Sequence, residues 1–137
     1  GLGDVYKRQH ESYDDRKESA YVGIYNGIVS EQSFPHIMPQ ENGNKTDNRW
    51  LEIYDDFGSG IRITGKPFFN FNIQNYSDKD LNRSKKAHTL IRGEKNWLHI
   101  DYKQMGLGGD DSWSPRVHKE FLLKNKVYHY TYAIEPL

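Results

Sequence analysis

The side chains of this chain that could carry catalysis are first of all carboxylates. Five acidic residues lie in segments that read as loops or strand ends: Glu41, Asp47, Asp101, Asp110 and Asp111. Two carboxylates hydrolyse a glycosidic bond only when they face each other across the substrate, about 5–9.5 Å apart. Nothing in the sequence pairs any two of the five, so we assign no catalytic acid or base to this chain.

Histidines and cysteines are the residues that most often bind transition metals. No two of the six histidines are separated by two or four residues, the spacings that would put a metal-binding pair on one face of a strand or helix. The chain contains no cysteine, which excludes disulfides, thiol nucleophiles and zinc–thiolate sites. We therefore predict no metal site in this chain.

A glycine-rich segment, Met105–Pro115, combines three glycines with two adjacent acids and a tryptophan. Its glycine spacing does not match the dinucleotide-binding fingerprint, and a calcium loop would need acids at alternate positions. The segment is more typical of a chain-reversing loop in which Asp110 and Asp111 accept backbone N–H groups. We expect Trp113 to anchor this loop by packing into the core beneath it.

Trp97 is the aromatic residue best placed to contact a ligand. Apolar and polar residues alternate from Trp97 to Tyr102, which is the pattern of a half-buried strand. Leu98 and Ile100 fall on the apolar face of that strand. Trp97 therefore lies on the opposite face and is free for another role.

Further strands and one helix must position these residues. Alternation over 50–54 and 60–64, with glycines between them, predicts a β-hairpin. A strand over 69–74 has one apolar and one amide-bearing face, and a final strand is predicted over 127–134. Ser77, followed by acidic residues, predicts the start of one short helix. Strands at this spacing indicate an all-β fold, an antiparallel β-sandwich with one short helix.

Composition excludes several partners. The 19 basic and 19 acidic residues of the 137-residue chain balance, and no block of like charge occurs, so neither nucleic acid nor a membrane surface is an expected partner. No apolar run reaches the roughly 20 residues of a spanning helix.

Several segments resemble, in order, the C-terminal or small-chain domain of the family 2 β-galactosidases. They are Pro39–Gly43, Asp47–Trp50, Asn70–Asn72, Tyr76–Leu81, Trp97–Asp101 and Met105–Pro115. The stretch Gly108-Gly-Asp-Asp-Ser-Trp113 beside the Glu41-Asn-Gly43 loop is the most specific element. The resemblance runs from about residue 10 to Leu137.

The resemblance implies that residues 10–137 are the C-terminal part of this domain, itself part of a galactose-mutarotase-like supersandwich. The family pattern breaks at Arg8-Gln9, where a Gly-Pro pair is expected. Residues 1–9, which include no initiator Met, are therefore expected to be non-native, derived from a sequencing adaptor.

The resemblance also implies an activity for the parent enzyme. The family hydrolyses terminal β-D-galactosides such as lactose with retention, using two glutamates of a preceding barrel domain, with magnesium and a monovalent cation, sodium or potassium, as cofactors. None of those catalytic or metal-binding residues lies in this chain, so the fragment alone is expected to be inactive. Trp97 matches the tryptophan that forms a platform for the sugar on the leaving-group side, and His99 stands where asparagine is expected.

The expected partners are a galactoside, the rest of the β-galactosidase chain or a large subunit, and further copies in a homo-oligomer. The cytoplasm is the favoured compartment, with the periplasm as the alternative. Three other hypotheses remain open at this point: a free-standing carbohydrate-binding module, a separate small subunit of a two-chain enzyme, and a structural domain in which Trp97 is buried and touches no sugar.

Overall fold

The structure, a computed structural model, describes residues 10–137 of the chain. The prediction for residues 1–9 lies outside the described residues. The elements in chain order are the 3-10 turn η1 (Val29–Glu31), strands β1 (Lys45–Tyr54) and β2 (Gly60–Gln74), helix α1 (Asp78–Arg83), η2 (Ala87–Thr89), β3 (Trp97–Asp101), η3 (Lys119–Phe121) and β4 (Thr131–Pro136). Among residues 10–137 the only α-helix is α1, so the predicted all-β class with one short helix is confirmed.

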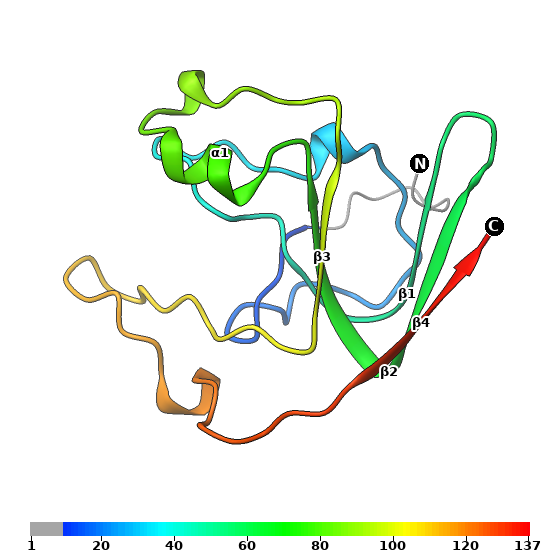
Figure 1. Cartoon of the computed structure of the whole chain (residues 1–137). Coiled ribbons are helices and arrows are strands. Elements are labelled where there is room, and N and C mark those ends of the chain that lie inside the picture. The colour runs from blue at the N-terminus through cyan, green and yellow to red at the C-terminus, as the bar shows by residue number, and fades with distance from the viewer. Residues whose placement is uncertain (1–9) are drawn as a thin grey trace.

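The described strands form one antiparallel sheet built around β2. β1 pairs along β2, β4 lies beside the first half of β2, and β3 lies beside its second half (Figure 1). The register between β1 and β2 shifts between the pairs Trp50↔Thr64 and Asn48↔Phe69, so residues 65–68 form a bulge without partners in β1. This bulge lets one long strand pair with different neighbours at its two ends.

The core lies on the apolar face of this sheet. Alternation brings five buried side chains of β1 and β2 together: Leu51, Ile63, Phe69, Phe71 and Ile73. Leu98 and Ile100 of β3 pack against them, as the sequence pattern predicts. Burial of each such side chain contributes about 1.5–3 kcal/mol. The core therefore ties β3, and with it Trp97, to the centre of the sheet.

The predicted hairpin and helix are both confirmed. Asp55 Oδ1 accepts hydrogen bonds from the backbone N–H groups of Phe57 and Ser59, and Gly58 supplies the positive φ of the turn. Ser77 caps α1 in a capping box, in which its hydroxyl accepts from Asp80 N–H while the Asp80 carboxylate accepts from Ser77 N–H. Local side chains thus determine where both elements begin and end.

The final strand is shorter than the predicted 127–134 and is shifted toward the C-terminus. Thr131 pairs with Lys66, the last β2 residue before Pro67, which has no N–H to donate to a ladder. Tyr130, directly before the strand, stacks instead: its ring lies 5.6 Å from that of Tyr102 and 5.7 Å from that of Tyr132. The prediction for residues 127–130 is therefore wrong, although the tyrosines do share one face.

No helix within residues 10–137 has the length and apolar character needed to cross a membrane.

Candidate functional site

Trp97 begins β3 and lies on the face of that strand that points away from the core. It pairs with Gln74 of β2, and 46% of its surface is exposed. Leu98, the next residue, points to the apolar core. The predicted orientation is confirmed, and among the described residues Trp97 is not part of the core.

His99 and Asp101 lie on the same face of β3 as Trp97, because strand residues two apart share a face. They pair with Asn72 and Asn70 of β2, whose side chains are buried. The amide-bearing face predicted for β2 therefore lies next to the polar face of β3. We call Trp97, His99 and Asp101 the polar face of β3.

The Glu41-Asn-Gly43 loop is bound against this part of the sheet. Asn72 donates its Nδ2 to the Asn42 carbonyl at 2.6 Å, and Gly43 N–H donates to Glu11 Oε2 at 2.9 Å. Gly43 has φ +79°, and a Cβ there would lie 2.4 Å from the Gln32 carbonyl oxygen. Only glycine fits this position, because any side chain would clash with the Gln32 backbone. The loop can therefore pack closely against the neighbouring backbone.

Two of the five acidic candidates come together through this loop. The Gln104 amide donates to Glu41 Oε1 at 3.3 Å and to Asp101 Oδ2 at 3.2 Å. Asp47 instead pairs with Lys17 at 2.7 Å. Gln104 thus joins Glu41 to Asp101 at one end of the polar face of β3. This link was not predicted, because it depends on the path of a loop 60 residues away in sequence.

His99 also contacts the helix. Its Nε2 lies 3.6 Å from Asp78 Oδ1, and the two side chains are 29% and 64% exposed. Asp78 is the first residue of α1, which the Ser77 cap holds in position. The polar face of β3 is therefore flanked by α1 at the Trp97 end and by the Glu41 loop at the Asp101 end.

The glycine loop is held by polar contacts. Gly108 N–H donates to Asp15 Oδ2 at 2.8 Å, and Arg16 donates to the Gly108 carbonyl. Burial alone would raise the pKa of Asp15, but N–H groups of Gly108 and Leu107 stabilise its carboxylate and lower that pKa below its usual value. Asp15 therefore binds the loop as a charged group.

Trp113 does not anchor the loop. Its side chain is 93% exposed, so the prediction that it packs into the core is wrong. Asp111 Oδ1 accepts the N–H groups of Trp113 and Ser114, as expected of a turn, whereas Asp110 contacts His118. This hydrogen bonding shapes the loop without any apolar packing beneath the tryptophan.

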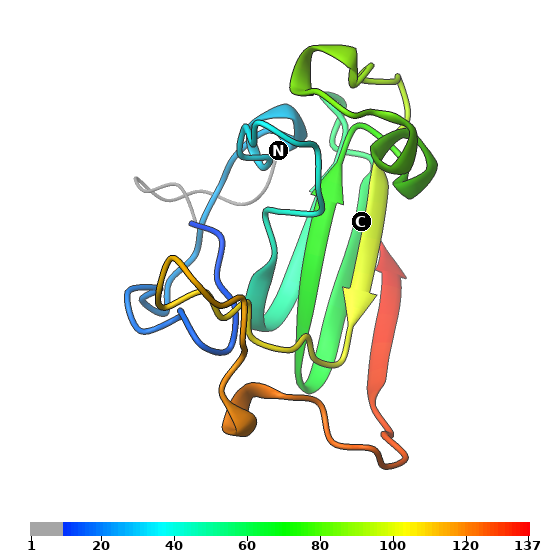
Figure 2. The same cartoon turned by 90° about the vertical axis from the view of Figure 1, so that its left-hand side faces the viewer.

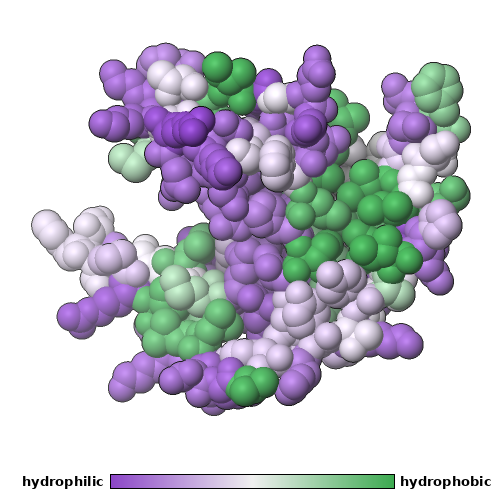
Figure 3. All heavy atoms as spheres, viewed as in Figure 1, coloured by the Kyte–Doolittle hydropathy of each residue, from purple (hydrophilic) through white to green (hydrophobic). Residues whose placement is uncertain are grey.

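A hollow lies between α1 with its following loops and the glycine loop. In Figure 1, α1 and its following loops lie above and to the left of β3, and the glycine loop extends from the lower left. Figure 3 shows the same side hollowed between these two parts, with hydrophilic residues at its floor. Figure 2, which faces this side, shows β2 and β3 between the same two parts.

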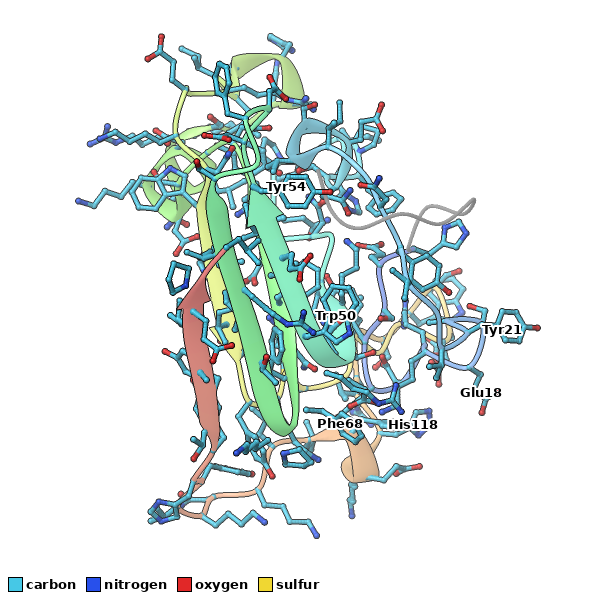
Figure 4. All side chains as sticks on the ribbon, turned by 90° about the vertical axis from the view of Figure 1, so that its right-hand side faces the viewer. Glu18, Tyr21, Trp50, Tyr54, Phe68 and His118 are labelled. Atoms are coloured by element: carbon cyan, nitrogen blue, oxygen red, sulfur yellow. The ribbon has the colours of Figure 1, made fainter. Side chains whose placement is uncertain are left out.

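Two cavities in the described part of the chain lie elsewhere. One of about 430 Å³ is lined by residues 17–25 and by β1 residues such as Trp50, and it lies on the side that carries Trp50 and Tyr21 in Figure 4. The other, of about 220 Å³, lies between residues 33–42 and the loop after α1. Neither is lined by Trp97. The polar face of β3 is therefore an open surface, which a ligand would need further protein to enclose.

The fold and this surface define the class of protein: an all-β domain with an exposed tryptophan set among an imidazole, amides and carboxylates. The family model described as β-galactosidase small chain matches residues 7–134. The chain belongs to the β-galactosidase small chain family.

Curated relatives agree with this assignment. A β-galactosidase of Priestia megaterium is 40% identical over 129 residues, which is 93% of this chain and 12% of the relative. A β-galactosidase of Vibrio cholerae is 41% identical over 121 residues, 88% of this chain and 11% of the relative. One of Streptococcus thermophilus is 35% identical over 129 residues. The chain thus spans about an eighth of the length of the relatives it matches.

Proposed function

We propose that this chain is the C-terminal region of a retaining β-galactosidase that hydrolyses terminal β-D-galactosides such as lactose. In this proposal the chain supplies scaffold and an aromatic wall to the active site, and Trp97 is the wall. The catalytic glutamates lie in a barrel domain outside this chain, and the chain alone has no galactosidase activity.

The observation that carries the proposal is that Trp97, in a chain of this family, is 46% exposed on the polar face of β3. The C–H face of a sugar ring packs against an indole ring, and the polar groups beside it suit hydroxyls. Leu98 and Ile100 hold the strand from the other face, so the indole is presented by a rigid element.

Magnesium and a sodium or potassium ion remain part of the proposal for the parent enzyme. Within residues 10–137, no three His, Cys, Asp or Glu side chains lie close enough together to hold a metal ion. The residues present do not fit such a cofactor, so we assign no step in this chain to a cation.

The test is Trp97→Ala in the full-length enzyme. Loss of the platform should lower kcat/KM for lactose by about 5- to 150-fold, equivalent to 1–3 kcal/mol of sugar binding, with no change in thermal unfolding. Trp97→Phe should retain most of the activity. Trp113→Ala is the matched control, since it removes an exposed indole from the glycine loop. An unchanged kcat/KM in Trp97→Ala, or a loss explained by unfolding, would refute the proposed role.

A second candidate is a separate small subunit that joins a large one, which the small-chain description of the family favours. The genomic sequence upstream of the codon for His10 distinguishes the two. An in-frame barrel domain supports the single-chain enzyme, and a start codon with no barrel supports the subunit or a carbohydrate-binding module. Assembly into a homo-oligomer is a further prediction, which light scattering of the full enzyme would test.

A further inference from the structure

His99 is the polar side chain nearest to Trp97 along the same face of β3. Strand residues two apart are separated by about 7 Å, roughly the span of one sugar ring with its hydroxyl groups. A ring that lies on Trp97 and extends toward Asp101 therefore places hydroxyls over His99. The imidazole is 29% exposed, which leaves an edge available to a ligand.

The surroundings of His99 limit how its ring can turn. Asp78 Oδ1 lies 3.6 Å from Nε2, and Asp78 is held at the start of the capped helix α1. On the β2 side, His99 pairs with Asn72, whose Nδ2 is already bound to the Asn42 carbonyl. The imidazole is thus confined between a helix residue and a fixed amide.

His99 can exchange hydrogen bonds with a hydroxyl group. One ring nitrogen of a neutral imidazole donates a hydrogen bond and the other accepts one, and a sugar hydroxyl can do either. Asp101, the next residue on this face, accepts from Gln104 through one carboxylate oxygen and lies two residues farther along the strand from Trp97. His99 is therefore the nearer group on the polar face of β3 that can bind a hydroxyl of a sugar beside Trp97.

We propose that His99, oriented by Asp78, makes this wall selective for galactosides whose leaving group is itself a sugar. An aryl leaving group stacks on Trp97 equally well but has no hydroxyl to offer His99. A site that binds a hydroxyl discriminates against a ligand that lacks it, because the buried side of the polar group is then left unpaired. This inference rests on the proposed function of Trp97.

The experiment compares two substrates in the full-length enzyme. The values of kcat/KM for lactose and for 2-nitrophenyl β-D-galactoside are measured in the wild type, His99→Ala, His99→Gln and Asp78→Asn. The lactose-to-nitrophenyl ratio should fall about tenfold in His99→Ala, the effect of one lost hydrogen bond, and less in Asp78→Asn. His99→Gln, which retains an acceptor, should recover part of the ratio. Lys79→Ala, an exposed α1 residue, is the matched control.

The outcomes separate this inference from the proposed function. Equal losses with both substrates, or an unchanged ratio, would overturn the role of His99. If Trp97→Ala weakens lactose hydrolysis while the His99 variants keep the wild-type ratio, only this inference fails. If Trp97→Ala has no effect on either substrate, the proposed function fails. Thermal unfolding checks each variant, and Asp78→Asn, at an exposed side chain, decides the question if His99→Ala does not fold.

Discussion

Lys45 is a buried charge whose removal should stabilise the domain. Its side chain is only 1% exposed, and its Nζ donates to the Gly43 carbonyl at 2.5 Å. Burial lowers the pKa of Lys45 from 10.5 to about 8, and the nearby carboxylate of Glu11 opposes this only in part. The change to make is Lys45→Met, which retains an unbranched side chain of similar length without the charge.

The size of the effect follows from the two pKa values. The difference between 10.5 and about 8 corresponds to roughly 3 kcal/mol of penalty on the folded state while the lysine is charged. The Gly43 carbonyl loses its partner in the variant, at a cost of about 1 kcal/mol. We therefore expect Lys45→Met to raise the free energy of unfolding at pH 7 by about 2 kcal/mol.

The pH dependence follows from the lower pKa of Lys45 in the folded state. Below pH 8 both states of the wild type bind the Lys45 proton, and the full penalty is present. Between pH 8 and 10.5 the unfolded chain binds more protons than the folded one, so wild-type stability rises with pH. Lys45→Met lacks this rise.

The assay is urea unfolding of the 137-residue chain by tryptophan fluorescence from pH 7 to 9.5. The upper limit avoids Tyr13, whose pKa is raised to about 12, mainly by burial, and whose ionisation in the unfolded chain lowers stability above pH 10. Lys79→Met is the control for loss of an exposed lysine. The reasoning is refuted if the difference between wild type and Lys45→Met is the same at pH 7 and 9.5, or if Lys45→Met is the less stable at pH 7.

Two further predictions concern local geometry. Gly108→Ala should lower the free energy of unfolding by about 3 kcal/mol or more, because φ is +67° and a Cβ would lie 2.3 Å from the Arg116 carbonyl oxygen. Gly109→Ala, at φ +76° with open space around it, should lose only about 1 kcal/mol, and equal losses in urea unfolding would contradict the contact. Ser77→Ala should cost about 1 kcal/mol and speed amide exchange in α1; unchanged exchange would show that the Asp80 capping box is not needed.

Much of the fold could be predicted from local patterns. Phe69, Phe71 and Ile73 alternate with amides, and the structure buries them in the core. Ser77 begins the helix as predicted. These features depend on side-chain period and on hydrogen bonds between residues close in sequence, so neighbouring residues carry the information.

Predictions from the local pattern failed where burial or strand pairing depends on residues far away in sequence. Trp113 is an aromatic residue in a tight loop, yet contacts to Asp15 and Phe121 hold that loop without it. The last strand starts at Thr131, not at Val127, because its partner β2 offers no ladder beyond Lys66. Neither the exposure of Trp113 nor the start of β4 at Thr131 can be predicted from the residues next to them in sequence.

The candidate site divides in the same way. Local alternation around Trp97 is enough to place it opposite the core face, because that alternation admits one orientation of the strand. The contact of Asp78 with His99, and the contacts of the Gln104 amide with both Glu41 and Asp101, arise from the folding of distant segments onto one another. Those contacts join β3 to a helix and a loop through sheet register and loop path. Sheet register and loop path depend on packing across the whole domain, and the local alternation of apolar and polar residues does not predict them.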